Sequence, residues 1–316
     1  MSTMLDEPAQ HRSTEAASAQ RLRTTMAAMR LSFTWFGTRK TLSPEQKAQA
    51  AESFGAEGDY LSAGKKLLNV RHPKFKAVTS VKTRATSFFK GVSLPFPEPG
   101  LRLIRQDDLD MVDAQMATLK AELEDAVEEL DRHYDELKSA ARNRLGDLYN
   151  ESDYPGTLMG LFDVSWDFPS VEPPNYLQRL SPELYRQECE RMQARFSEAV
   201  QLAEEAFTEE LTKLVEHLSE RLTGQQDGKA KVFRDTAITN LTEFFQRFQR
   251  LNIRSNEQLD ELVEQAQGIV RGVQPQQLRE NHDLRANVAA QLGNIQNSLD
   301  DLLVDRPRRN ILRKPR

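Results

Sequence analysis

The sequence contains a single cysteine, Cys189, among 316 residues. One cysteine excludes an intrachain disulfide framework and is typical of proteins that work in a reducing cytoplasm. No apolar run approaches the length of about 18 residues that marks a transmembrane helix, so we expect no contact with a membrane. Residues 1–29 also lack the continuous apolar region of a secretory signal. These absences predict a cytoplasmic protein.

Motifs of the common enzyme classes are missing as well. The sequence has no G-x-G-x-x-G, no G-x-S-x-G and no H-E-x-x-H pattern. Residues 62–66 carry the Gly-Lys pair of a phosphate loop, but Lys66 stands where Ser or Thr would bind magnesium. The five histidines are scattered singly and form no zinc-type cluster with the cysteine. We therefore expect a protein that is not an enzyme and has no catalytic residue, cofactor or metal.

Proline is absent from residues 106–151, and glycine occurs there once, at Gly146. Apolar residues recur from Leu109 to Leu137 in alternating steps of three and four, the heptad pattern of helices that pack side by side. A second helical run, residues 181–223, has a stripe nearer the 3.6-residue period. We expect a mainly α protein built on a long antiparallel helical hairpin with these two coiled-coil-like arms. Two kinked helices within a compact bundle are the alternative.

Regular alternation of apolar and polar residues predicts a small sheet. The strongest signal is residues 162–168, where large apolar side chains fall on one side and polar ones on the other. Residues 31–36 and 101–104 are shorter candidates. An unbroken first arm would hold residues 101–104 and 162–168 at opposite ends. We therefore expect 162–168 to pair with 31–36 in a two-stranded β-sheet.

Caps, prolines and glycines divide the rest of the chain. The further helices that we expect cover residues 44–54, 61–69, 73–90, 232–251, 255–271 and 275–304. The expected organisation is a disordered tail over 1–29, a strand with basic helices over 30–105, the hairpin over 106–223 with an inserted strand at 161–168, a C-terminal helical bundle over 224–305, and a basic disordered tail over 306–316.

The net charge of −5 conceals a strong separation of charge along the chain. Residues 61–105 hold ten Lys and Arg against one acidic residue, Glu98, whereas residues 106–223 hold 11 bases against 28 acids. Residues 306–316 hold six bases and no acid. Such a chain can set its basic block against its own acidic arms or offer each to a different partner. Both alternatives stay open at this point.

The basic block also contains aromatic residues, Phe75, Phe88 and Phe89. Basic and aromatic side chains together can bind a nucleic-acid backbone and its bases. These aromatics lie at helical spacing, however, which favours packing in a core. If the basic segments bind nucleic acid or an acidic partner, the contacts that we expect are Lys65, Lys66, Arg71, Lys74, Lys76, Lys82, Arg84, Arg306, Arg308, Arg309, Arg313 and Lys314.

The order of features resembles a bacterial and phage-borne domain family of unknown function. The resemblance lies in the segment Phe33-Thr-Trp-Phe-Gly-Thr-Arg-Lys40, the pair Lys65-Lys66, the proline-rich stretch that ends in Leu101-Arg-Leu-Ile104, and the long acidic helix that follows. It covers roughly residues 31–220 and concerns layout rather than an invariant motif. Members of that family tend to be encoded near a MoxR-type AAA+ ATPase and a von Willebrand factor A protein, so the resemblance implies a partner and no reaction.

Taken together, these features favour a non-enzymatic interaction or scaffold protein. It would associate with itself as a homo-oligomer or act as an adaptor to an AAA+ ATPase system. The alternative is a nucleic-acid-binding protein that uses the basic block over 65–105 and the C-terminal tail.

Overall fold

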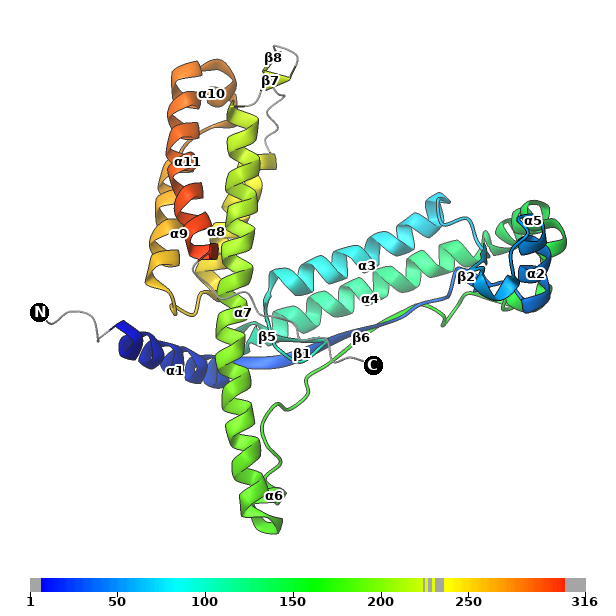
Figure 1. Cartoon of the computed structure of the whole chain (residues 1–316), viewed down its shortest axis with the longest axis horizontal. Helices are drawn as coiled ribbons and strands as arrows, with labels where there is room; N and C mark the ends of the chain where they lie inside the picture. The colour runs from blue at the N-terminus through cyan, green and yellow to red at the C-terminus, as the bar shows by residue number, and fades with distance from the viewer. Residues whose placement is uncertain (1–6, 224, 227–228, 231–235, 305–316) are drawn as a thin grey trace, which may run out of the picture. The chain divides into compact units, whose positions relative to one another are not determined.

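The computed structural model describes residues 7–223, 225–226, 229–230 and 236–304. Within them the protein is mainly helical with small antiparallel sheets, as the sequence predicts (Figure 1). The described residues form two compact units. Among the described residues, the first draws on 7–28, 92–106 and the described part of 170–304, and the second on 29–91 and 107–169. Both units combine segments that are far apart in sequence.

The first unit is organised around α7 (Pro182–Thr223), which confirms that the second arm is one continuous helix. Helices α1, α8 and α11 pack against α7, and α9 packs against α11 (Figure 1). The other helices of this unit are α1 (Glu7–Thr25), α6 (Tyr176–Leu180), α8 (Thr236–Leu251), α9 (Glu257–Val270), α10 (Pro275–Glu280) and α11 (His282–Val304).

The core of the first unit follows the apolar stripe of α7, which is buried from Met192 to Leu222. Phe207 meets Phe248 of α8 edge to face, with ring centroids 5.0 Å apart. Strands β4 (Ser93–Pro95) and β5 (Leu101–Arg105) form a hairpin that also packs on this helix. The expected strand at 101–104 is thus confirmed as β5. A second, very short hairpin joins β7 (Gln225–Gln226) to β8 (Lys229–Ala230).

The second unit is organised around two helices that lie side by side, α3 (Pro73–Gly91) and α4 (Leu109–Asp131) (Figure 1). Its other elements are most of β1 (Met26–Thr34), β2 (Arg39–Thr41), α2 (Pro44–Glu52), the 3-10 helix η1 (Gly58–Tyr60), β3 (Gly64–Lys66), α5 (Tyr134–Leu145), the 3-10 helices η3 (Gly146–Leu148) and η4 (Glu151–Asp153), and β6 (Asp163–Asp167).

The predicted pairing of the two tryptophan-bearing segments is confirmed. Residues 30–34 of β1 pair antiparallel with 163–167 of β6, with Leu31 opposite Trp166 and Phe33 opposite Val164. The sheet is larger than the two strands expected, because its strand order is β4-β5-β1-β6. The indole Nε1 of Trp166 donates to Asp113 of α4 at 2.7 Å, which fixes β6 against that helix.

The prediction of an unbroken first arm is wrong. Helix α4 ends at Asp131 and α5 begins at Tyr134. The carboxylate of Asp131 accepts hydrogen bonds from the Leu158 amide at 2.7 Å and from the Thr157 hydroxyl at 2.9 Å. Helix α4 therefore ends at the residue that binds the loop around 157–158. The two arms also belong to different units, and α4 has α3 as its neighbour in its own unit, so the expected hairpin is not confirmed.

Three further expectations need correction. The N-terminal segment, expected as a disordered tail, forms α1 and the first residues of β1. The helix expected over 61–69 is replaced by β3, which is held by pairing with β2. The last helix is divided into α10 and α11 near Asn281, whose side chain accepts from the Leu284 amide at 3.0 Å. The basic tail 306–316 lies outside the described residues.

Candidate interaction surfaces

Two of the basic residues predicted to contact a partner form ion pairs with α4 instead. On α3, Lys74 Nζ lies 3.0 Å from Glu129 Oε2, and Arg84 pairs with Glu122. The hydrogen bond and the charge of Lys74 lower the pKa of Glu129, and Arg132 adds to the effect. Both pairs are partly exposed, and such pairs contribute little to stability. Their consequence is electrostatic, because acidic side chains of α4 offset two of the positive charges of α3.

Lys82 has a different neighbour on the same helix. Its Nζ lies 4.3 Å from the ring centroid of Trp35 and 4.9 Å from that of Phe33. An ammonium group over an aromatic face is attracted by the negative charge density of the ring. Lys82 therefore covers the aromatic side of β1.

Two of the three aromatic residues named for the basic block are buried, and the third, Phe88, is partly exposed. Phe75 and Phe89 are buried, together with Val78, Val81 and Ala85 of the same α3 stripe. Phe75 also meets Phe162 edge to face, with centroids 6.3 Å apart. Helical spacing thus indicated core packing correctly for these residues. Bases of a nucleic acid cannot stack on buried rings.

The most deeply buried of the predicted basic residues is Lys65, whose side chain is 6% exposed. Its Nζ lies 2.6 Å from Asp153 Oδ2 and donates to the Leu148 carbonyl oxygen, also at 2.6 Å. Lys40, from β2, pairs with the other oxygen of the same carboxylate. The three charges form a cluster, which we call the Asp153 cluster (Lys40, Lys65 and Asp153).

Two opposing effects act on the carboxyl group of this cluster. Burial raises the pKa of Asp153, while the hydrogen bonds and charges of Lys40 and Lys65 lower it more, so the pKa lies below its ordinary value. Nearby, burial and the adjacent tyrosines raise the pKa of Tyr134 to about 12, and burial together with Tyr149 does the same for Tyr154. Tyr134 and Tyr154 are therefore neutral at physiological pH. The ion pairs of Asp153 with Lys40 and Lys65 connect η4 to the β2–β3 pair.

The remaining predicted contacts on α3 and before it are exposed. Lys66, Arg71 and Lys76 all have exposed side chains. Lys66 lies on β3 directly opposite Arg39 of β2, which is also exposed. Sequence analysis missed Arg39, because only the strand register brings it beside Lys66. The predicted tail contacts, Arg306, Arg308, Arg309, Arg313 and Lys314, lie outside the described residues.

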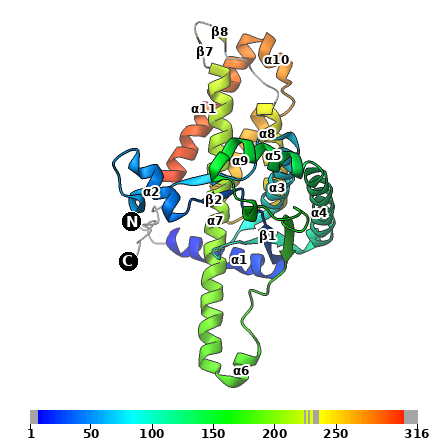
Figure 2. The ribbon, with the colours of Figure 1, turned by 90° about the vertical axis from the view of Figure 1, so that its right-hand side faces the viewer.

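A different surface lies where α6 meets the beginning of α7 (Figures 1 and 2). Tyr176, Leu180 and Leu184 are 62%, 76% and 41% exposed. Tyr176 and Leu180 are four residues apart on α6, so they share one side of that helix. Leu184 lies on α7, after the extended backbone of Ser181. We call these three residues the α6–α7 patch. Burial of the α7 stripe starts only at Met192, so the patch lies beyond the core.

Another pair of exposed aromatic residues lies between β2 and β3. Phe54 is 83% and Tyr60 88% exposed. The segment that carries them is well braced: η1 packs on α2, and a Cβ atom added at Gly58 would lie 3.0 Å from the backbone of Ala48. Large apolar side chains held out from a rigid base are typical of contact residues.

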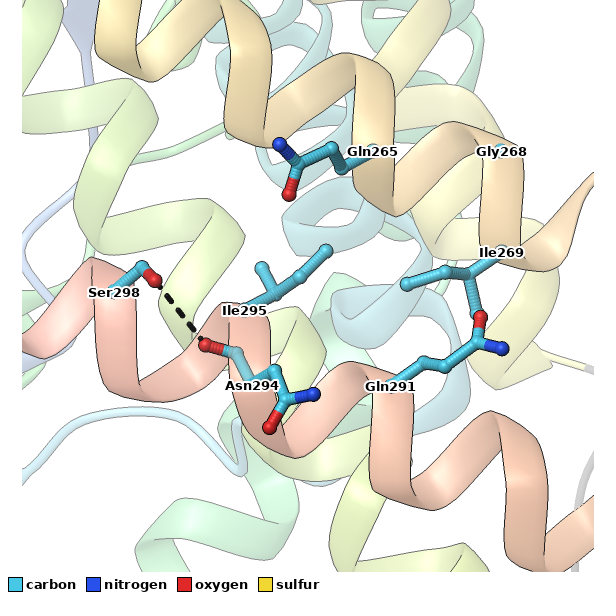
Figure 3. A pocket seen from close by; sticks show the side chains of 7 residues that line it. All are labelled: Gln265, Gly268, Ile269, Gln291, Asn294, Ile295 and Ser298. Atoms are coloured by element: carbon cyan, nitrogen blue, oxygen red, sulfur yellow. Dashed lines mark hydrogen bonds between the residues drawn. The ribbon is translucent and has the colours of Figure 1, made fainter.

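The first unit also has a shallow depression of about 410 Å³ between α9 and α11 (Figure 3). Its lining side chains carry no charge, and the hydroxyl of Ser298 already donates to the Asn294 carbonyl oxygen at 3.3 Å. The lining residues are Gln265, Gly268, Ile269, Gln291, Asn294, Ile295 and Ser298. Such a surface offers amide hydrogen bonds but no acid, base or nucleophile of the kind that catalysis uses.

Cys189 of α7 is partly buried. Among the described residues, no group of three or more His, Cys, Asp or Glu side chains is arranged to hold a metal ion. Over the same part of the chain, no helix combines the length and apolarity of a membrane span. Comparison of the whole chain with profiles of protein families, with curated proteins and with solved structures gives no match.

Proposed function

We propose that this chain is a non-enzymatic interaction protein that associates with a second copy of itself through the α6–α7 patch. The observation that carries the proposal is the exposure of Tyr176, Leu180 and Leu184, three large apolar side chains within nine residues of the chain. Fully burying a large apolar side chain contributes about 1.5–3 kcal/mol. A two-fold interface would bury each of the three residues twice, once in each copy.

The charges around the patch favour a second copy as the occupant. Glu183 pairs with Arg186, and Glu188 pairs with Arg191, so acidic and basic residues alternate along the first turns of α7. A helix with alternating signs is complementary to an antiparallel copy of itself, since each sign can meet its opposite. A strongly acidic or strongly basic partner would meet repulsion from half of these side chains.

The basic block gives less support to a nucleic-acid-binding function. Lys74 and Arg84 are paired with acids of α4, and Lys65 is buried in the Asp153 cluster. A protein that follows a phosphate backbone needs such side chains unpaired and accessible. The family resemblance suggests an AAA+ ATPase as a further partner. We also propose that the protein works in the cytoplasm, which agrees with its single cysteine.

The test is the molar mass in solution, measured by light scattering over a wide range of protein concentration. The wild-type chain should approach the mass of a dimer, and L180E/L184E should remain a monomer, because a carboxylate in an apolar interface is costly. M159E is the matched control, since Met159 is an apolar residue of similar exposure, 46%, in the second unit. A wild-type monomer at every concentration, or a dimer that L180E/L184E leaves intact, would contradict the proposal.

A further inference from the structure

The two strands β2 and β3 place like charges opposite one another twice. Lys40 lies opposite Lys65, and Arg39 lies opposite Lys66. The strands approach closely, since a Cβ atom at Gly64 would lie 3.1 Å from the Lys40 carbonyl oxygen. Like charges directly opposite in an antiparallel pair repel and destabilise it. Two such pairs in succession therefore need a physical explanation.

The explanation for the first pair is the Asp153 cluster. Successive residues of a strand point to opposite sides of the sheet, so Lys40 and Lys65 share one face. There the carboxylate of Asp153, with a side chain 2% exposed, lies between the two ammonium groups. The carboxylate of Asp153 attracts both ammonium groups and so offsets the repulsion between Lys40 and Lys65.

The second pair, Arg39 and Lys66, lies on the opposite face and is exposed. Among the residues that the structure describes, no carboxylate forms an ion pair with either side chain. This face therefore repeats the geometry of the Asp153 cluster but lacks the anion.

We propose that the Arg39–Lys66 face binds an acidic peptide segment of a protein partner, with a partner carboxylate between the two cations as Asp153 lies between Lys40 and Lys65. Arg and Lys together present several N–H donors to a carboxylate, and hydrogen bonds between charged groups are the strong ones. The proposal is independent of self-association, because the face belongs to the second unit and the α6–α7 patch to the first.

A protein partner is favoured over a nucleic acid by the surroundings of the face. The segment between the two strands exposes Phe54 and Tyr60, which suits an interface with an apolar centre. The same segment carries three exposed acidic residues, which can meet basic residues of the same protein partner. They are Glu52, Glu57 and Asp59.

The test uses the full-length chain and a fluorescently labelled decaglutamate peptide, followed by fluorescence anisotropy at low salt. The wild type should bind the peptide. R39E/K66E should bind about tenfold more weakly or not at all, since a charged hydrogen-bonding pair is lost, and the neutral R39Q/K66Q should fall between the two. The matched control is K213E/R271E, which makes the same change in net charge at exposed positions of the first unit.

Each outcome decides the proposal. Loss of binding in R39E/K66E with retention in K213E/R271E supports it, provided that circular dichroism shows both variants folded. No binding by the wild type, or equal loss in both variants, overturns it. Binding of a single-stranded thymidine oligonucleotide that is tighter than that of the peptide and is lost in R39E/K66E would assign the face to nucleic acid and overturn the peptide proposal.

The single variant R39E adds a readout that a merely structural role of Arg39 would not give. This substitution would place a carboxylate opposite Lys66 across the strands, so an attractive pair would replace a repulsive one. The melting temperature should therefore rise while the affinity for decaglutamate falls. A variant that loses both stability and binding would contradict the proposal.

Discussion

The two faces of the β2–β3 pair carry the same kind of residue at the same spacing and differ in their ion pairs. On one face Lys40 and Lys65 surround a buried carboxylate, and on the other Arg39 and Lys66 are exposed. Lys40 is itself exposed, so a counter-charge, and neither residue type nor burial alone, distinguishes the cations of the first face from those of the second. The following experiments test that contrast.

The largest effect should follow removal of the anion. D153A would leave Lys65 buried without a counter-charge, and breaking a buried pair in this way costs about 3–5 kcal/mol. Urea denaturation of the full-length chain measures the loss. The control is E151A, because Glu151 pairs with Arg142 at an exposed position. Equal stability of D153A and E151A would show that the cluster is not structural.

Acid should reduce the stability that the face carrying Lys40 and Lys65 provides, because their ion pairs need the ionised carboxylate of Asp153. Because the pKa of Asp153 is lower in the folded state than its ordinary value, its contribution to stability is complete above that ordinary value, about 3.9. The contribution is lost as the pH falls through the folded pKa. The difference in unfolding free energy between wild type and D153N should therefore shrink below about pH 4. A difference that is constant with pH would contradict this assignment.

On the exposed face, charge reversal should stabilise the chain. R39E should raise the unfolding free energy by about 0.2–1 kcal/mol, the range of cross-strand pair energies. The reverse change on the other face, K40E, should destabilise it, since it would put a second carboxylate beside Asp153. Urea denaturation of both variants gives the comparison. The same sign of effect for both variants would remove the distinction between the faces.

The smallest effect should come from α3. R84Q removes an ion pair with Glu122 whose two side chains are 52% and 40% exposed, and such pairs contribute less than about 1 kcal/mol. The loss should diminish further with added salt. A loss as large as that of D153A, measured by the same urea denaturation, would mean that exposure is not what sets the energy of these contacts.

Sequence periodicity predicted the second arm and the strand at 162–168, because both depend on regular apolar spacing. The pairing of 31–36 with 162–168 is also confirmed, although it was inferred from an unbroken first arm that the structure does not have. It failed at the end of the first arm. The expected stripe ran from Leu130 through His133, whereas the structure buries Tyr134 after Leu130. The four-residue step from buried Leu130 to buried Tyr134 coincides with the break between α4 and α5. Asp131, which binds the 157–158 loop there, gives no local signal.

The β2–β3 pair was beyond sequence analysis for a similar reason. Both strands are three residues long and mainly polar, so they have no apolar alternation. Asp153 forms ion pairs with a lysine of each strand, and it lies far along the chain from Lys40 and Lys65. The pair Lys65-Lys66 was recognised as a candidate contact, but only the fold shows that Lys65 is buried and Lys66 is exposed.

The most direct test of the account is the binding of decaglutamate by R39E, measured beside its thermal unfolding. We expect a variant that melts at a higher temperature than the wild type and has lost its affinity for the peptide. A variant that binds the peptide as the wild type does would contradict it, because Arg39 would then be an ordinary solvent-exposed side chain.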